Sequence, residues 1–299
     1  MTPEDHALAR ARTYAFIAEV LLDGWTDRAV ALARDLPWMP PLPDDPDQRA
    51  ARHQRALGHG VPPYESVFRS DDGLLGGPIA HEVREAYAQM GFRHRRTDIE
   101  PDHAGLQCAA LGFLCAAEAD AHRDGVPTER LVELQQGFLT AHLGLWVDML
   151  ADAITRQGVP EVAAVTSLLV ELVRDHAPFE PEPAATEDVL ADPKTGLKSV
   201  ARYLLVPGRC GVWLSQADIQ RVAAEAELAC GFGRRVQMLE SLWFSAVDHE
   251  RVPQLCEALQ HQLDELVTDD PRVLATRAML TTLATTAAQQ LDEGGRQDG

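Results

Sequence analysis

The chain has 299 residues, of which 45% are apolar, enough to bury one large hydrophobic core or two smaller ones. Its 46 acidic and 27 basic side chains give a formal net charge of −19, which disfavours binding to nucleic acid or anionic membranes and favours a cationic partner. Residues 1–5 are acidic where a secretory signal is basic, and no apolar run approaches the roughly 20 residues that span a bilayer.

The first part of the chain is typical of a series of helices. Apolar spacing predicts helices over residues 5–22, 26–35, 46–58, 79–90, 104–123, 128–156 and 160–176. The proline-rich run 37–43 cannot lie inside a helix, because proline lacks the N–H donor. Gly91 fits a left-handed C-cap. Pro101 predicts a helix start, because proline suits the first turn and disfavours helical dihedrals in the residue before it.

The composition changes after residue 176. An acidic, proline-rich stretch predicts a linker over 181–193, which divides the chain into a helical domain over 1–180 and a helical C-terminal extension over 194–299. Apolar spacing in the extension predicts helices over 216–229, 234–247, 252–267 and 271–292. Because no alternating strand pattern occurs, we expect an all-α fold: a helical bundle with an additional helical C-terminal region.

One face of the extension is strongly apolar. Its residues recur at helical spacing and are Met238, Leu239, Leu242, Trp243 and Val247. A face of that kind must be buried, and we expect the extension to pack on the bundle.

The cysteines do not predict a metal or disulfide site. They are Cys108, Cys115, Cys210, Cys230 and Cys256. No pair has Cys-x-x-Cys spacing and the number is odd, so reduced thiols in a cytoplasmic protein are expected. Nucleotide-binding glycine loops and His-Glu-x-x-His zinc motifs are also absent from the sequence.

The run Glu100-Pro101-Asp102-His103 is the most informative part of the sequence. Carboxylates at a helix start stabilise the helix by roughly 0.3–1 kcal/mol through its dipole, and this explanation suffices locally. The same carboxylates could instead accept bidentate hydrogen bonds from a pair of arginines on a peptide. Glu100-x-x-His103 also has the spacing of a di-iron ligand pair, but no second Glu-x-x-His motif is present, so a metallo-oxidase is disfavoured.

Further motifs accompany this run in a fixed order. They are Tyr14 in the first helix, Pro63-Tyr64-Glu65-Ser66-Val67-Phe68, Tyr87-x-x-x-Gly91, the Glu-Pro-Asp-His run, and Phe138-Leu139-x-x-His142-Leu143-x-x-Trp146. This ordered set, over roughly residues 5–176, resembles the TorD/DmsD/NarJ-type family of redox-enzyme maturation chaperones. The extension makes the chain longer than ordinary members and resembles that of longer ones.

The resemblance implies a cytoplasmic, non-enzymatic chaperone without a cofactor or metal. It would bind the twin-arginine signal peptide, the apo form, or both, of a molybdopterin oxidoreductase of the DMSO reductase type, as a monomer or homodimer, without nucleic acid or stable membrane insertion. The peptide-binding residues that it implies are Glu100, Pro101, Asp102, His103, Tyr64, Glu65, Phe68, Tyr87 and Gly91. The alternative is a helical adaptor or regulatory protein without a redox client.

Overall fold

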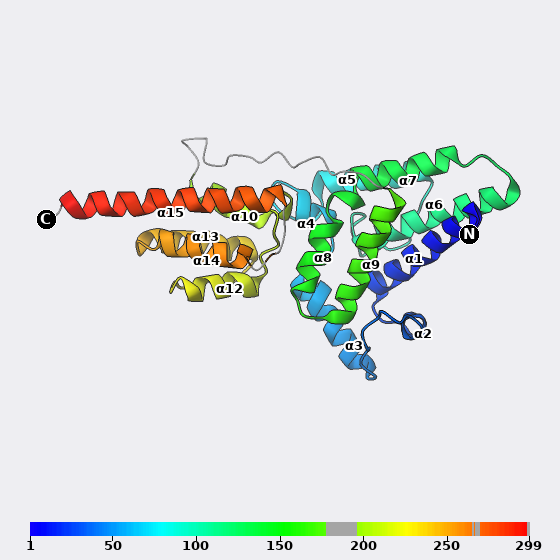
Figure 1. Ribbon diagram of the computed structural model, residues 1–299, viewed down its shortest axis with the longest axis horizontal. Helices are drawn as coiled ribbons and strands as arrows, with labels where there is room; N and C mark the ends of the chain where they lie inside the picture. The colour runs from blue at the N-terminus through cyan, green and yellow to red at the C-terminus, as the bar shows by residue number, and fades with distance from the viewer. Residues whose placement is uncertain (178–195, 265, 267–269, 298–299) are drawn as a thin grey trace. The chain divides into compact units, whose positions relative to one another are not determined.

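The computed structural model describes residues 1–177, 196–264, 266 and 270–297 (Figure 1). Over these residues the protein is all-α, as expected, and its only β-type contact is an isolated bridge between Tyr64 and His103. Two compact units are present, one of Met1–Ser70 and Leu74–Glu182 and one of Asp71–Gly73 and Pro183–Gly299. The expected linker at 181–193 lies outside the described residues.

The helices of the first unit mostly agree closely with the predicted ranges, although the short helix over Glu65–Arg69 was not predicted. They are α1 (Pro3–Asp23), α2 (Asp27–Arg34), α3 (Pro46–His53), the π-helix η1 (Gln54–Gly60), α4 (Glu65–Arg69), α5 (Gly77–Met90), α6 (Ala104–Asp124), α7 (Glu129–Ala141), the 3-10 turn η2 (Leu143–Leu145), α8 (Val147–Thr155) and α9 (Pro160–His176). Gly91 ends α5 in the left-handed conformation, as predicted.

The core of the first unit is built around α1 and α6, which run side by side (Figure 1). Gly112 of α6 permits their close approach, because a Cβ at this position would lie 3.3 Å from the carbonyl oxygen of Ala11 on α1. Arg10 of α1 donates two hydrogen bonds to the buried Glu118 of α6, which also accepts one from Gln135 of α7. Apolar packing and a satisfied polar network therefore hold these helices together.

Two predicted boundaries in the first unit are wrong. The helix start predicted at Pro101 is wrong: α6 begins at Ala104, where the apolar spacing places it, because residues 101–103 form a turn and His103 is the N-cap. The helix expected over 128–156 is broken at His142, whose backbone has φ −129° and ψ −96°, and continues as η2 and α8. The break turns His142 and Trp146 inward, where both make buried polar contacts.

The second unit consists of α10 (Leu197–Leu205), α11 (Pro207–Cys210), α12 (Gln216–Glu225), α13 (Arg235–Asp248), α14 (Val252–Asp264) and α15 (Pro271–Gln297). Four of the five residues of the predicted apolar face lie in this unit's own core: Met238, Leu239, Leu242 and Trp243. The fifth, Val247, is half-exposed. This face therefore needs no cover from the first unit, and packing of the extension on the bundle stays a prediction.

Arg235 at the start of α13 is a polar element within this second core. Its guanidinium lies 3.5 Å over the ring of Trp213 and donates hydrogen bonds to the carbonyl oxygens of Leu214 and Leu205. The guanidinium stacks on the indole ring and donates hydrogen bonds to two backbone carbonyls, and it thereby connects three segments of the unit.

Candidate functional site

The Pro101-Asp102-His103 turn is joined to the segment before α4 by backbone hydrogen bonds. Glu65 donates its N–H to the carbonyl of Asp102 at 3.0 Å, and Ala104 donates to the carbonyl of Pro63 at 2.8 Å. The carboxylate of Asp102 accepts the backbone N–H of Ser66 at 2.8 Å. The two most distinctive motifs of the sequence therefore meet in space and clamp α4 to the start of α6.

Asp102 and His103 are buried in this clamp, with exposed fractions of 0% and 6%. Burial raises the pKa of the Asp102 carboxyl, which the Ser66 hydrogen bonds only partly offset. Burial also lowers the pKa of His103 to about 3, so its ring is neutral. The Nδ1 atom of His103 accepts the N–H of Gly105 at 3.0 Å and caps α6.

Glu65 is a second buried carboxylate, at the first position of α4. It accepts a hydrogen bond of 2.6 Å from Gln107 of α6 and pairs with Arg69 and, at 3.4 Å, with Nδ1 of His142. Gln107 in turn accepts a hydrogen bond from the indole N–H of Trp146. Glu65 therefore binds α4, α6 and the break after α7 into one network.

The predicted site residues fall into two groups. Glu100 and Gly91 are exposed and Tyr64 is half-buried. The others are buried: Pro101, Asp102, His103, Glu65, Phe68 and Tyr87. The structure brings most of them together around the clamp, where Tyr87 donates its hydroxyl proton to the carbonyl of Pro101 at 2.8 Å and Phe68 packs 5.2 Å from the Trp146 ring. In this conformation Glu100, Gly91 and Tyr64 are the predicted site residues with substantial surface open to a ligand.

An acidic groove lies between α5 and α7. Its volume is about 370 Å³, and its lining residues are Glu82, Glu85, Ala86, Gln89 and Met90 of α5 with Arg130, Glu133, Leu134, Gly137, Phe138, Ala141 and His142. Three carboxylates border an apolar floor, and His142 connects this floor to the Glu65 network. Glu100 lies 4.0 Å from Arg84, also on α5.

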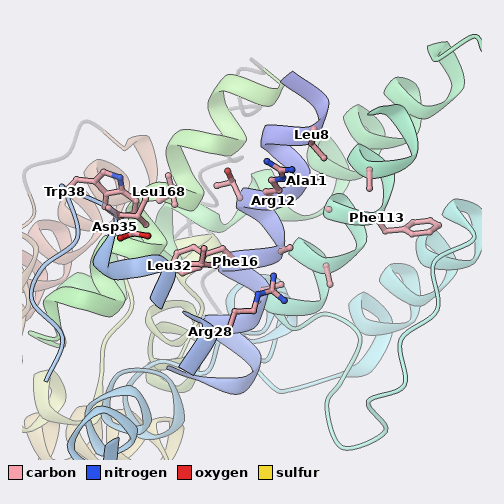
Figure 2. Close-up of a pocket in the computed structure, with 17 residues that line it drawn as sticks. Leu8, Ala11, Arg12, Phe16, Arg28, Leu32, Asp35, Trp38, Phe113 and Leu168 are labelled. Carbon is pink, nitrogen blue, oxygen red and sulfur yellow. The ribbon is translucent and has the colours of Figure 1, made fainter. Parts of the chain in front are cut away.

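A larger, mainly apolar pocket of about 1030 Å³ lies over α1, α2 and α6 (Figure 2). Leu8 and Phe16 of α1, Leu32 of α2, Phe113 of α6, Leu168 of α9 and Trp38 line it, together with Arg12, Arg28 and Asp35. Figure 2 shows Arg12 and Arg28 between the Trp38 end and the Phe113 end of this apolar pocket.

Neither hollow was predicted from the sequence, although a signal for the acidic groove was present. Glu82, Glu85 and Gln89 recur at helical spacing, which places three polar side chains on one face of α5. The corresponding face of α7 carries Arg130 and Glu133. The periodicity gives the two faces but does not show that they oppose each other.

Within the part of the chain that the structure describes, no group of three or more His, Cys, Asp or Glu side chains could hold a metal ion. None of the described helices is both long and apolar enough to cross a membrane. All five cysteines are free thiols.

The first unit is thus all-α, with a buried clamp between two sequence motifs and two surface hollows. Residues 55–152, from η1 to α8, match the family model described as nitrate reductase delta subunit. No match was found among curated proteins or among solved structures. This part of the chain is therefore similar to the NarJ/TorD family of redox-enzyme maturation chaperones, whose members are generally non-catalytic.

Proposed function

We propose that this protein is a cytoplasmic, client-specific chaperone for a molybdopterin oxidoreductase of the DMSO reductase type. It binds the client's twin-arginine signal peptide, its apo form, or both, and assists cofactor insertion before export or assembly. The family match supports the chaperone class. The observation that carries the peptide-binding part is the acidic groove, in which Glu82, Glu85 and Glu133 border an apolar floor.

The chemistry of the acidic groove suits a peptide with basic residues beside an apolar stretch. Arginine side chains donate paired, charge-assisted hydrogen bonds to carboxylates, and leucine-like side chains fill the floor around Leu134 and Phe138. Glu100 adds a fourth exposed carboxylate on the loop beside α5. In this proposal the buried residues of the clamp act by positioning α5 and the Glu100 loop, and they do not touch the peptide.

Titration calorimetry with a synthetic twin-arginine signal peptide and its twin-lysine version tests the proposal on the full chain. We expect the arginine peptide to bind more tightly, because guanidinium groups match carboxylates bidentately. Its affinity should fall between low and high salt, because exposed charges are screened within about 10 Å at 0.1 M salt. The triple change Glu82→Gln, Glu85→Gln, Glu133→Gln should weaken binding several-fold.

Glu171→Gln is the matched control, because Glu171 is an exposed carboxylate on α9 that does not line the acidic groove. Equal affinity for the two peptides, or the same loss in control and triple variant, would overturn the placement in the acidic groove. No binding to any signal peptide or apo-oxidoreductase would favour a helical adaptor without a redox client.

A further inference from the structure

The apolar pocket over α1, α2 and α6 leaves large hydrophobic side chains in contact with water. Leu32, Trp38 and Phe113 on its margins are 43%, 45% and 45% exposed. At about 1030 Å³, the pocket matches the upper end of small-molecule sites, which reach about 1,000 Å³. Exposed apolar surface rimmed by polar groups is characteristic of an interaction site.

The charges at this pocket differ from those of the acidic groove. Arg12 projects from α1 and Arg28 from α2, in a chain whose formal net charge is −19 (Figure 2). Arg28 lies 3.5 Å from Glu19 but remains mostly exposed, with 71% of its side chain accessible to solvent. Asp35 lines the pocket near Trp38. The pocket therefore offers two cations in its middle and an anion at one end.

We propose that the apolar pocket docks an amphipathic helix that has aliphatic side chains on one face and carboxylates on its flank. Its aliphatic residues would cover Leu32, Trp38 and Phe113, and its carboxylates would pair with Arg12 and Arg28. A helix fits better than an acyl chain, because the half-exposed margins make the pocket an open trough and the rim carries charges of both signs.

In this proposal the acidic amphipathic helix belongs to the mature part of the client, so the proposal rests on the proposed function. A row of aromatic rings connects the two surfaces: Phe113 packs 5.9 Å from Phe92, which lies 5.1 Å from Tyr87, which lies 5.7 Å from Phe138 of the acidic groove. One client chain could therefore occupy both, with its basic segment in the groove and its acidic helix in the pocket.

Fluorescence anisotropy of labelled model helices tests the docking on the full chain. The probe is a capped helix of leucine, alanine and glutamate with leucines at i, i+3, i+4 and i+7, and its matched version carries glutamine at each glutamate position, which removes the charge without creating a ligand for the acidic groove. We expect the glutamate helix to bind about fivefold or more tightly than the glutamine helix. Leu32→Asp with Phe113→Asp should weaken binding about tenfold or more. Arg12→Glu with Arg28→Glu should reverse the preference.

All four positions are exposed or half-exposed, so circular dichroism and thermal melting should show folded variants. Arg93→Glu with Arg95→Glu is the charge-matched control and should leave glutamate-helix binding unchanged, because both arginines are exposed and line neither hollow. Retained binding of the twin-arginine peptide by the pocket variants would support two separate surfaces. If the protein binds the glutamate helix but binds no signal peptide, helix docking in the apolar pocket is supported and the proposed function is contradicted.

Three results would overturn the proposal. The first is equal affinity of the wild type for both helices. The second is loss of twin-arginine peptide binding in the pocket variants, because the pocket would then hold the signal peptide. The third is a wild-type dimer in analytical ultracentrifugation that Leu32→Asp dissociates, because a second copy of the chain would then be the occupant.

Discussion

The carboxylates of the first unit fall into two groups, one buried in hydrogen-bond networks and one exposed along a groove. Glu65 and Asp102 belong to the motifs that dominate the sequence, yet both are completely buried and hold the backbone and neighbouring side chains in place. Glu82, Glu85 and Glu133 belong to no motif, yet they border an open groove. The distinctive motifs of this protein therefore supply the buried residues that hold the site together, whereas its accessible charge comes from helix faces that carry no motif.

Glu65→Ala should have the largest effect on stability. It removes the acceptor shared by Gln107, Arg69 and His142 and takes this partner from the buried amide of Gln107 and the buried ring of His142. Arg69 is 28% exposed and keeps its hydrogen bond to the carbonyl of Ala141. Breaking a buried pair of this type costs about 3–5 kcal/mol, which a urea titration would measure. Glu65→Gln retains an acceptor for Gln107 and should cost less. An unchanged unfolding midpoint for Glu65→Ala would refute the structural role of Glu65.

Asp102→Ala should destabilise the protein by about 1–3 kcal/mol, because it leaves the buried N–H of Ser66 without its acceptor. This exceeds the roughly 0.3–1 kcal/mol expected from a carboxylate that acts through the helix dipole alone. Asp102→Asn is the matched variant, since its amide oxygen can still accept this hydrogen bond. If Asp102→Ala weakens peptide binding per folded molecule without affecting unfolding, Asp102 belongs to the ligand contacts after all.

His103 predicts a pH dependence of stability. Burial lowers its pKa in the folded protein to about 3. A histidine in the unfolded chain has a pKa of about 6.5, so acid protonates the unfolded chain first. Stability should therefore be complete above about pH 6.5 and decline as the pH falls towards about 3, by up to about 1.4 kcal/mol per pH unit for this group. His103→Asn keeps an N-cap acceptor and removes the titration.

Urea titrations at several pH values should therefore give a shallower acid loss for His103→Asn than for the wild type. The remaining slope belongs to other groups, including His176, whose pKa burial lowers to about 4. Parallel pH profiles for wild type and His103→Asn would show that His103 is accessible to protons in the folded state.

The smallest effect on stability is expected in the acidic groove. Glu82→Gln with Glu133→Gln changes exposed side chains, so the free energy of unfolding should stay within about 0.5 kcal/mol of the wild type for each substitution. Binding of the twin-arginine peptide should nevertheless weaken. If this double variant loses as much stability as Asp102→Ala, the distinction between the buried carboxylates and the carboxylates of the acidic groove is wrong.

Much of the fold was predictable because helices have local causes. The spacing of apolar residues gives α1, α2, α5 and α9 to within about two residues, and α12 begins at Gln216, as predicted, with Ser215 as its N-cap. The errors occur where contacts between residues far apart in the sequence determine the backbone conformation. The break at His142 depends on contacts with Glu65, which lies 77 residues earlier in the chain.

The all-α class and the order of the motifs on which the resemblance to the family rests could be predicted from the sequence alone. The burial of Asp102 and His103, and the acidic groove across which α5 and α7 face each other, depend on the packed fold. The physical reason is that helical periodicity reports which residues share a face, whereas the burial and pKa of a polar side chain depend on partners contributed by remote segments.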